Sequence, residues 1–244
     1  LWQAFDKNYT DEIETLLKEN GIKLLTGTKV TKFIGDKAVE AVELEGGKKL
    51  PTDLVIMGLG VKPNASLAKE AGLELNKKGA IIVDQYTRTS DSDIFAVGDC
   101  SAKRCFFTGK EAPVLLASTA AMEAKIGGSN AFQLRLIRAN KGTISAFSTQ
   151  VFGRTFAAAG ITEARARQEG FSIMTGNFTT MDRHPGSLPG AQKITIKLMF
   201  SKCSGVILGA QISGGDCIGE MINILSLAIQ KNTTAAELNT FQVA

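Results

Sequence analysis

One short stretch of the chain combines residue types that could hold a ligand. TRTSDSDIFAVGDC, residues 87–100, runs through apolar residues directly into Gly98 and Asp99. A carboxylate at the tip of a strand can accept hydrogen bonds from ribose or ribitol hydroxyls, and glycine lets a ligand approach the backbone closely. On spacing alone, an ordinary tight turn remains the alternative interpretation.

A second motif of the same kind is VIMGLGVKPN, residues 55–64, where Gly58, Gly60 and Pro63 follow an apolar run. In open α/β sheets, ligands bind just outside the carboxyl ends of the strands. Both motifs therefore suit a nucleotide cofactor, although a plain turn explains the second motif as well as the first.

Other catalytic chemistry finds little support in the sequence. The chain has one histidine, His184, and no G-x-G-x-x-G fingerprint, so we predict neither a Ser-His-Asp nor a Cys-His site. Its four cysteines form no C-x-x-C pair and no zinc spacing, which predicts reduced thiols of a cytosolic protein and no metal site. Cys100 directly follows Asp99 and is the cysteine nearest to a candidate site.

The composition is that of a globular protein. Of 244 residues, 44% are hydrophobic and 21% charged, and the net charge is only +4. The basic residues are scattered among acids, which argues against a nucleic-acid or membrane surface, and no apolar stretch approaches the roughly 20 residues that span a bilayer. The chain starts without Met or a signal peptide and stops in mid-pattern, so we expect a piece of a longer cytoplasmic protein.

The elements that must position the two motifs begin with a helix and short strands. Residues 11–18 predict a helix capped by Thr10 and ended by Gly21. The segments IKLL, KVTKFIG and AVEAVELEGGKKL predict short strands. DLVIMGLG, residues 53–60, is almost unbroken in its apolar character, which is typical of a parallel strand that helices cover on both faces.

The middle of the chain carries the Asp99 motif. GAIIVD and DIFAVGD predict strands, and PNASLAKEAG predicts a short helix with Asn64 or Ser66 near its start and Gly72 at its end. A helix is also expected over residues 115–126, closed by Gly127 and Gly128, with further helix through FQLRLIR.

The pattern changes at about Lys141. TISAFSTQVFG and KITIKLMFSK alternate between apolar and polar residues, which predicts an antiparallel sheet with one solvent-facing side. ITEARARQEG and CIGEMINILSLAIQKN predict helices, and Thr234 with Glu237 predicts a capping box. The expected fold class is α/β and α+β: partial nucleotide-binding, Rossmann-like segments followed by an α+β domain with an antiparallel sheet.

Taken together, the two motifs resemble the pyridine nucleotide-disulfide oxidoreductases, the flavoproteins that bind two dinucleotides. VIMGLGVKPN is similar to the family segment G-x-G-x-x-P-N, and residues 89–99 match its late flavin motif T-S-x-x-x-I-F-A-x-G-D. FAAAGITEARARQEGF, KLMFSKCSGVILGAQISG and AIQKNTTAAEL resemble the family's dimerisation domain. Within the family, the chain looks most like the branch of NADH oxidase, NADH peroxidase and coenzyme A-disulfide reductase.

The resemblance implies roles for particular residues. Asp99 would hydrogen-bond the ribityl chain of FAD, and Gly98 would admit the cofactor. A helix that starts at Leu116 and Ala117 would point its amino end at the pyrimidine side of the flavin. Three further counterparts would lie between the two nucleotide sites, with a plain interdomain crossover as the alternative: Gly58, Gly60 and Pro63.

The resemblance also implies domains, cofactors and partners. Residues 1–60 would be the C-terminal half of an NAD(P)-binding domain, 61–140 the C-terminal part of an FAD-binding domain, and 141–244 a dimerisation domain that makes a homodimer. The parent enzyme would pass electrons from NAD(P)H through FAD to a small-molecule redox substrate: a disulfide, a thiol cysteine or oxygen. The chain as it stands lacks both glycine fingerprints and the family's redox cysteine, so we expect it to be inactive by itself.

The chain departs from the family in one loop. Ser187 and Leu188 stand where the branch has tyrosines that face the partner's active site, which puts coenzyme A-disulfide specificity in doubt. His184 could donate a proton near a flavin or thiol, with a solvated loop residue as the alternative. Two rival functions stay open: a non-catalytic dimerisation module and a ferredoxin-reductase-like flavoprotein.

Overall fold

The computed structural model describes residues 4–112, 114–132 and 138–242. It divides into two compact units, one made of Leu1–Ile13 and Lys62–Ala244 and the other of Glu14–Val61. Each unit has its own sheet, and each is described by itself.

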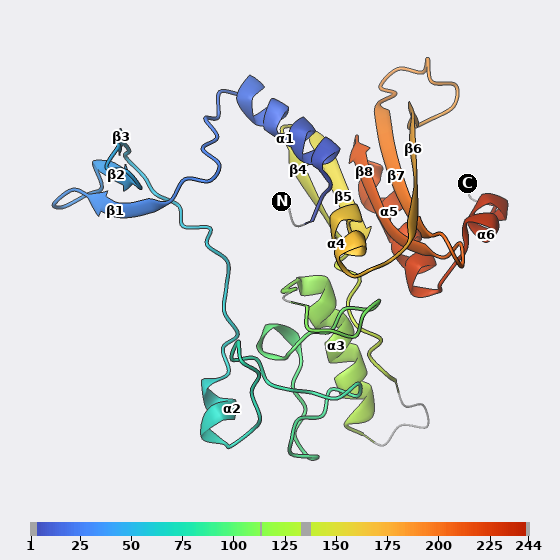
Figure 1. Ribbon diagram of the computed structural model, residues 1–244, viewed down its shortest axis with the longest axis horizontal. Helices are drawn as coiled ribbons and strands as arrows, with labels where there is room; N and C mark the ends of the chain where they lie inside the picture. The colour runs from blue at the N-terminus through green and yellow to red at the C-terminus, as the bar shows by residue number, and fades with distance from the viewer. Residues whose placement is uncertain (1–3, 113, 133–137, 243–244) are drawn as a thin grey trace. The chain divides into compact units, whose positions relative to one another are not determined.

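The smaller unit holds a three-stranded antiparallel sheet made of β1 (Val30–Ile34), β2 (Ala41–Leu44) and β3 (Lys49–Pro51). Val42 and Leu44 are buried on the central strand β2, which alternates as a half-buried strand should. These strands confirm the short strands that the sequence predicts in KVTKFIG and AVEAVELEGGKKL (Figure 1).

Two strands predicted in the smaller unit are wrong. Residues 22–25 and 53–60 have no strand structure, and in the second segment the side chains of Ile56 and Leu59 are 86% and 89% exposed. A parallel strand needs at least one neighbouring strand to pair with, and helices normally cover both of its faces. Among the described residues, β1, β2 and β3 pair only with one another, so neither apolar run has a strand to join.

Helix α1 (Lys7–Glu19) starts earlier than its sequence pattern indicates. Its first N–H groups bond to the carbonyl of Asp6, and Thr10, the predicted cap, lies inside the helix and donates to the carbonyl of Lys7. The predicted stop is confirmed: Gly21 has φ +77°, a left-handed conformation that glycine adopts without steric cost.

The segment around Asp99 is built from turns and single bridges. The predicted strands GAIIVD and DIFAVGD are wrong as strands, because Ile81 and Phe95 form only isolated bridges, with Ser101 and Arg88 respectively. Helix α2 (Ser66–Glu70) confirms the predicted short helix, and its Ala68 packs with Ile81 in a small core.

Helix α3 (Ala117–Asn130) runs through the two glycines that were predicted to end it. Gly127 is buried, and its missing side chain lets the helix approach Thr87 and Val97. The prediction failed because close packing favours glycine at this position, although glycine has a low helix propensity. Most of the further helix predicted through FQLRLIR lies outside the described residues.

Gly127→Ala is expected to lower the free energy of unfolding by about 1–2 kcal/mol, because overpacking outweighs the better helix propensity of alanine. The new Cβ would lie 2.8 Å from Thr87 Oγ1 and 3.0 Å from Val97 Cγ1. Gly128→Ala is the matched control, since its Cβ meets nothing within 4 Å, and it should stabilise by about 0.5–1 kcal/mol. Urea unfolding measures both, and equal effects of the two variants would contradict this packing argument.

The larger sheet has five antiparallel strands: β4 (Phe147–Val151), β5 (Arg154–Gly160), β6 (Ile173–Met181), β7 (Lys193–Ser201) and β8 (Ile207–Gly214). Their order is β4-β5-β8-β7-β6, and α5 (Ile218–Gln230) lies along one face (Figure 1). The core between α5 and this face includes Ile194, Ile212, Ile222 and Ile229. The predicted amphipathic helix and antiparallel sheet are confirmed.

The other face of this sheet is covered around Lys197 and Gln211, where the alternation predicts a solvent-facing side, whereas Asn177 and Thr179 of β6 are exposed. The start of α1 and helix α4 (Glu163–Gln168) supply side chains that cover it, and Lys197 and Gln211 are 8% and 5% exposed. Polar residues can be buried when ion pairs and hydrogen bonds satisfy them. A sequence pattern cannot distinguish such residues from solvated ones.

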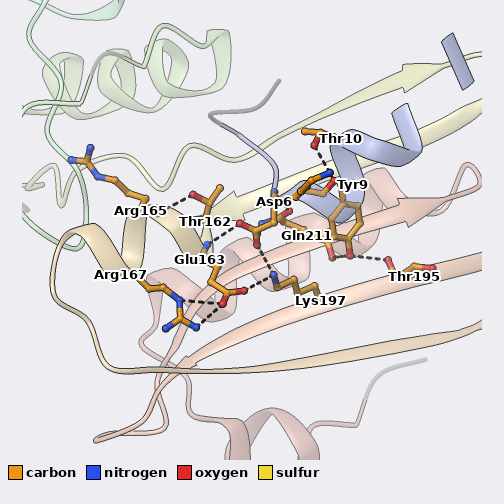
Figure 2. A network of polar contacts seen from close by, with 11 residues as sticks. Asp6, Tyr9, Thr10, Thr162, Glu163, Arg165, Arg167, Thr195, Lys197 and Gln211 are labelled. Carbon is orange, nitrogen blue, oxygen red and sulfur yellow. Dashed lines mark hydrogen bonds and ion pairs between the residues drawn. The ribbon is translucent and has the colours of Figure 1, made fainter. Parts of the chain in front are cut away.

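A network of ion pairs and hydrogen bonds satisfies the buried polar groups on this face (Figure 2). The Lys197 ammonium lies 2.8 Å from carboxylate oxygens of both Asp6 and Glu163. Gln211 exchanges two hydrogen bonds of 2.8 Å with Asp6, accepting from its backbone N–H and donating to its carboxylate. The hydroxyl of Tyr9 donates to the Gln211 carbonyl, and burial, followed by the charge of nearby Glu12, raises the Tyr9 pKa.

The predicted cap near the carboxyl end of the chain is confirmed. In α6 (Ala235–Thr240), the N–H of Glu237 donates to the Thr234 hydroxyl, and the Glu237 carboxylate accepts from the Thr234 N–H. The N–H of Thr234, and after it the Thr234 hydroxyl, donates to the Glu237 carboxylate and holds its pKa below the usual range.

Candidate functional site

The Gly98–Asp99 motif forms a tight turn. Gly98–Cys100 is a single 3-10 turn, η1, and Gly98 has φ +79°, which favours glycine. The Asp99 side chain is exposed, and among the described residues it has no hydrogen-bond or ion-pair partner. Its carboxylate oxygens are therefore available to accept hydrogen bonds from a ligand.

The start of α3 lies beside this turn. A Cβ added to Gly98 would sit 3.7 Å from the Cβ of Ala120, in the first turn of α3. Leu116, the residue before the helix, is extended and makes no side-chain cap. The N–H groups from Ala117 onward therefore keep the partial positive charge of a helix start. The structure thus brings Gly98 together with the helix start at Leu116 and Ala117.

A buried ion pair supports the turn from below. The side chains of Lys103 and Glu123 are 2% and 3% exposed, and their charged atoms are 2.8 Å apart. The Glu123 carboxylate accepts the N–H of Gly98 at 2.9 Å, and the Lys103 ammonium donates to the Gly98 carbonyl. Our reading of the sequence missed both residues. Glu123 was detectable as the lone acid in an alanine-rich helix, spaced three residues from Ala120 and four from Gly127.

The second motif is divided between the two units. Gly58 and Gly60 belong to the smaller unit, where Gly60 has φ +83°, and Pro63 belongs to the larger one. Their location between two nucleotide sites stays a prediction.

His184 lies in the loop that joins β6 to β7 and is exposed. Within the described parts of the chain it has no hydrogen-bond or ion-pair partner, whereas its neighbour Asp182 binds Arg183 and accepts the N–H of Gln192. The Arg183 side chain is the main cause that holds the pKa of the Asp182 carboxyl below its usual range. A proton-donating role of His184 stays a prediction.

Residues 4–112, 114–132 and 138–242 contain neither a metal-ligating cluster nor a membrane-spanning helix. No group of three or more His, Cys, Asp or Glu side chains there could hold a metal ion. No helix in these ranges is long and apolar enough to cross a membrane.

Comparison with protein families matches both the segment that holds the Gly98–Asp99 turn and the segment that forms the five-stranded sheet. Residues 1–124 match the family "Pyridine nucleotide-disulphide oxidoreductase", and residues 147–243 match the dimerisation domain of the same family. The chain belongs to the pyridine nucleotide-disulphide oxidoreductase family.

Three individual proteins show which members of the family this chain is similar to. An NADH oxidase of Methanocaldococcus jannaschii is 32% identical over 96% of this chain and 51% of its own length. The solved structure of a NAD-dependent persulfide reductase from A. fulgidus superimposes with a TM-score of 0.90 at 34% identity, over 99% of this chain and 44% of that one. The structure of the water-forming NADH oxidase of Lactobacillus brevis superimposes with a TM-score of 0.88 at 28% identity, over 99% of this chain and 53% of that one. The chain thus spans about half the length of the curated relatives it matches.

Proposed function

We propose that this chain supplies part of the FAD site and the dimerisation domain of an NAD(P)H-dependent flavoprotein oxidoreductase, of the NADH oxidase or coenzyme A-disulfide reductase type. The observation that carries the proposal is the exposed Gly98–Asp99 turn beside the start of α3 in a chain of this family. Relatives described as NADH oxidases and as a persulfide reductase support the class of reaction.

The residues at the turn fit a flavin. Ribityl hydroxyls need acceptors, and Asp99 offers a carboxylate that no described residue engages. Bound FAD would pass electrons from NAD(P)H to a disulfide, a thiol or oxygen. Beside it, the N–H groups at the start of α3 would favour negative charge, because no side chain caps them. The chain's own part in the chemistry is therefore to orient the cofactor and to stabilise its anionic form.

Asp99→Ala in the complete protein is expected to weaken FAD binding about 10- to 100-fold, the range for losing a hydrogen bond to a charged group. Fluorescence titration of the apoprotein with FAD measures the change. Asp93→Ala is the matched control, an exposed aspartate of the same stretch whose carboxylate makes no described contact. Equal FAD affinity of wild type and Asp99→Ala would remove this role for Asp99.

We further propose that the exposed face of α5 is part of a homodimer interface. Ile224 and Leu227 are 49% and 58% exposed and three residues apart, so they share one face of the helix. The match to a dimerisation domain over residues 147–243 supports homodimerisation. Large apolar side chains exposed together are typical of surfaces that bind proteins.

Leu227→Glu should raise the dimer dissociation constant about 30-fold, because truncating or charging a central interface residue costs about 2 kcal/mol. Sedimentation velocity over a concentration series measures it. Leu67→Glu, on α2 and 79% exposed, changes the same residue type outside residues 141–244 and should leave the dimer intact. A Leu227→Glu dimer as tight as wild type would exclude this face.

A non-catalytic dimerisation module is the rival function. It predicts the same dimer with no FAD binding to the complete protein, so the FAD titration of the wild type distinguishes the two proposals.

A further inference from the structure

The Lys103–Glu123 pair is buried more deeply than the Lys197–Asp6 pair, whose side chains are 10% and 9% exposed. Both side chains are almost completely buried, and Glu123 is the only acid within α3. Desolvating two charges costs about as much as their attraction returns, so well-packed apolar residues would stabilise the fold as well or better. The pair therefore calls for a role besides stability, and its other contacts indicate which.

Both polar groups of the Gly98 backbone are held by the pair. The N–H of Gly98 donates to Glu123 Oε2 at 2.9 Å, and its carbonyl accepts from Lys103 Nζ. Each peptide unit is planar, so the first bond fixes the plane before Gly98 and the second fixes the plane that leads into Asp99. Ser101 adds a hydroxyl that donates to the same carbonyl at 3.0 Å. The direction in which Asp99 leaves the turn is thus set by two charged side chains.

The same pair connects the turn to the helix beside it. Glu123 is part of α3, whereas Lys103 and Ser101 follow η1 along the chain. The Lys103 ammonium also donates to the Ser101 carbonyl at 2.9 Å, and its ion pair with Glu123 joins this segment to the helix. Since Ala120 of α3 also packs against Gly98, the turn and the helix start have little freedom to move apart.

We propose that Lys103 and Glu123 are positioning residues of the flavin site: the pair orients the Gly98 peptide so that the Asp99 carboxylate and the start of α3 face one ligand together. The inference rests on the proposed function, in which Asp99 and α3 contact FAD.

Two double variants of the complete protein separate positioning from stability. K103M/E123Q removes both charges and keeps an amide oxygen for the N–H of Gly98. K103M/E123L removes both charges and both contacts of the pair to Gly98, and leaves only the bonds from the Ser101 N–H and hydroxyl to the Gly98 carbonyl. Neither leaves an uncompensated buried charge, so their apoproteins are expected to melt within a few degrees of each other. FAD affinity and the absorption spectrum of bound flavin are then measured for both.

K103M/E123L should bind FAD about 10-fold more weakly than K103M/E123Q, with a flavin spectrum closer to that of free FAD, since it lacks an acceptor at position 123 for the Gly98 N–H. Equal affinities and spectra of the two variants would overturn the proposal. If K103M/E123L does not fold, K103M/E123Q is compared with wild type instead, because it removes the bond from Lys103 to the Gly98 carbonyl and keeps an acceptor for the Gly98 N–H. A loss of about 3-fold in FAD affinity is then expected, and unchanged affinity refutes the inference.

Asp99→Ala in the same series distinguishes a failure of the positioning role from a failure of the proposed flavin site. If Asp99→Ala loses FAD and the two double variants bind alike, the flavin site stands and the positioning role is wrong. If Asp99→Ala also binds FAD as wild type does, the proposed site itself is wrong, and the inference is overturned with it.

Discussion

Lys197→Met is expected to lower the free energy of unfolding by about 3–5 kcal/mol, the cost of removing one partner from a buried ion pair. The ammonium lies between the carboxylates of Asp6 and Glu163, on the covered face of the large sheet. Methionine fills a similar volume, so the cost comes from two carboxylates that lose their shared cation. Urea unfolding at pH 7 measures the change.

Arg167→Met is the matched control for this prediction. Arg167 also pairs with Glu163, at 2.7 Å, but its side chain is 66% exposed. An exposed pair contributes about 0–1 kcal/mol, so this variant should be nearly neutral. Similar losses for both variants would show that burial of Lys197 does not decide its contribution.

The pH dependence of the Lys197→Met effect has a defined sign. Hydrogen bonds from Lys197 and then Arg167 hold the pKa of Glu163 below its ordinary value of 4.5. A lowered pKa contributes stability above pH 4.5 that is lost as the pH falls through the folded-state pKa. The difference between wild type and variant should therefore shrink on the acid side.

On the alkaline side the sign is reversed. Burial alone would lower the pKa of Lys197, yet its hydrogen bonds to Asp6 and Glu163 outweigh burial and raise the pKa above 10.5. That contribution is present below pH 10.5 and is lost as the pH rises through the folded-state value. Between about pH 5 and 10 the difference should be constant. A difference that grows toward low pH would contradict the assignment.

Gly160→Ala is expected to cost about 3 kcal/mol or more, from overpacking against backbone together with a left-handed conformation. Gly160 ends β5 with φ +85° and pairs with Gly209 of β8. An added Cβ would overlap the carbonyl oxygen of Leu208, because real Cβ atoms stay at least 3.0 Å from other heavy atoms. Strand β8 is buried along its whole length between β5 and β7, so its backbone has little room to yield.

Gly153→Ala separates the two contributions. Gly153 also has a positive φ, +79°, but a Cβ there meets nothing within 4 Å. This control should cost only the conformational part, about 1–2 kcal/mol. Urea unfolding of both variants yields the steric part as a difference, and equal losses would show that β8 can move aside.

Local patterns were enough for much of this chain. The alternation in KITIKLMFSK, the apolar stripe of α5 and the Thr234–Glu237 capping box each involve residues close in sequence, and each appears in the structure. The family could also be inferred from quoted motifs, because the two segments and the dimerisation-like region occur in the family's order. Those features depend on neighbours along the chain or on short residue strings, which a sequence displays directly.

Other features depended on partners far away in the chain. Lys197 alternates like a solvent-facing residue, yet Asp6, near the opposite end of the chain, makes its burial possible. Residues 53–60 have the composition of a buried strand, yet among the described residues no strand pairs with them. The sequence marks Glu123 as the lone acid of its helix, but only the packing of α3 against the turn shows that Glu123 accepts the Gly98 N–H.

The sequence by itself therefore determined the local elements, the order of motifs and the family. Only the tertiary structure decided which polar residues are buried and which backbone groups they hold. The physical reason is that a side chain's periodicity reports which face it lies on, whereas the cost of burying a charge depends on whether an opposite charge reaches the same place. At Asp99 the sequence alone indicates a turn. The tertiary structure adds that Lys103 and Glu123 hold the peptide groups on both sides of Gly98.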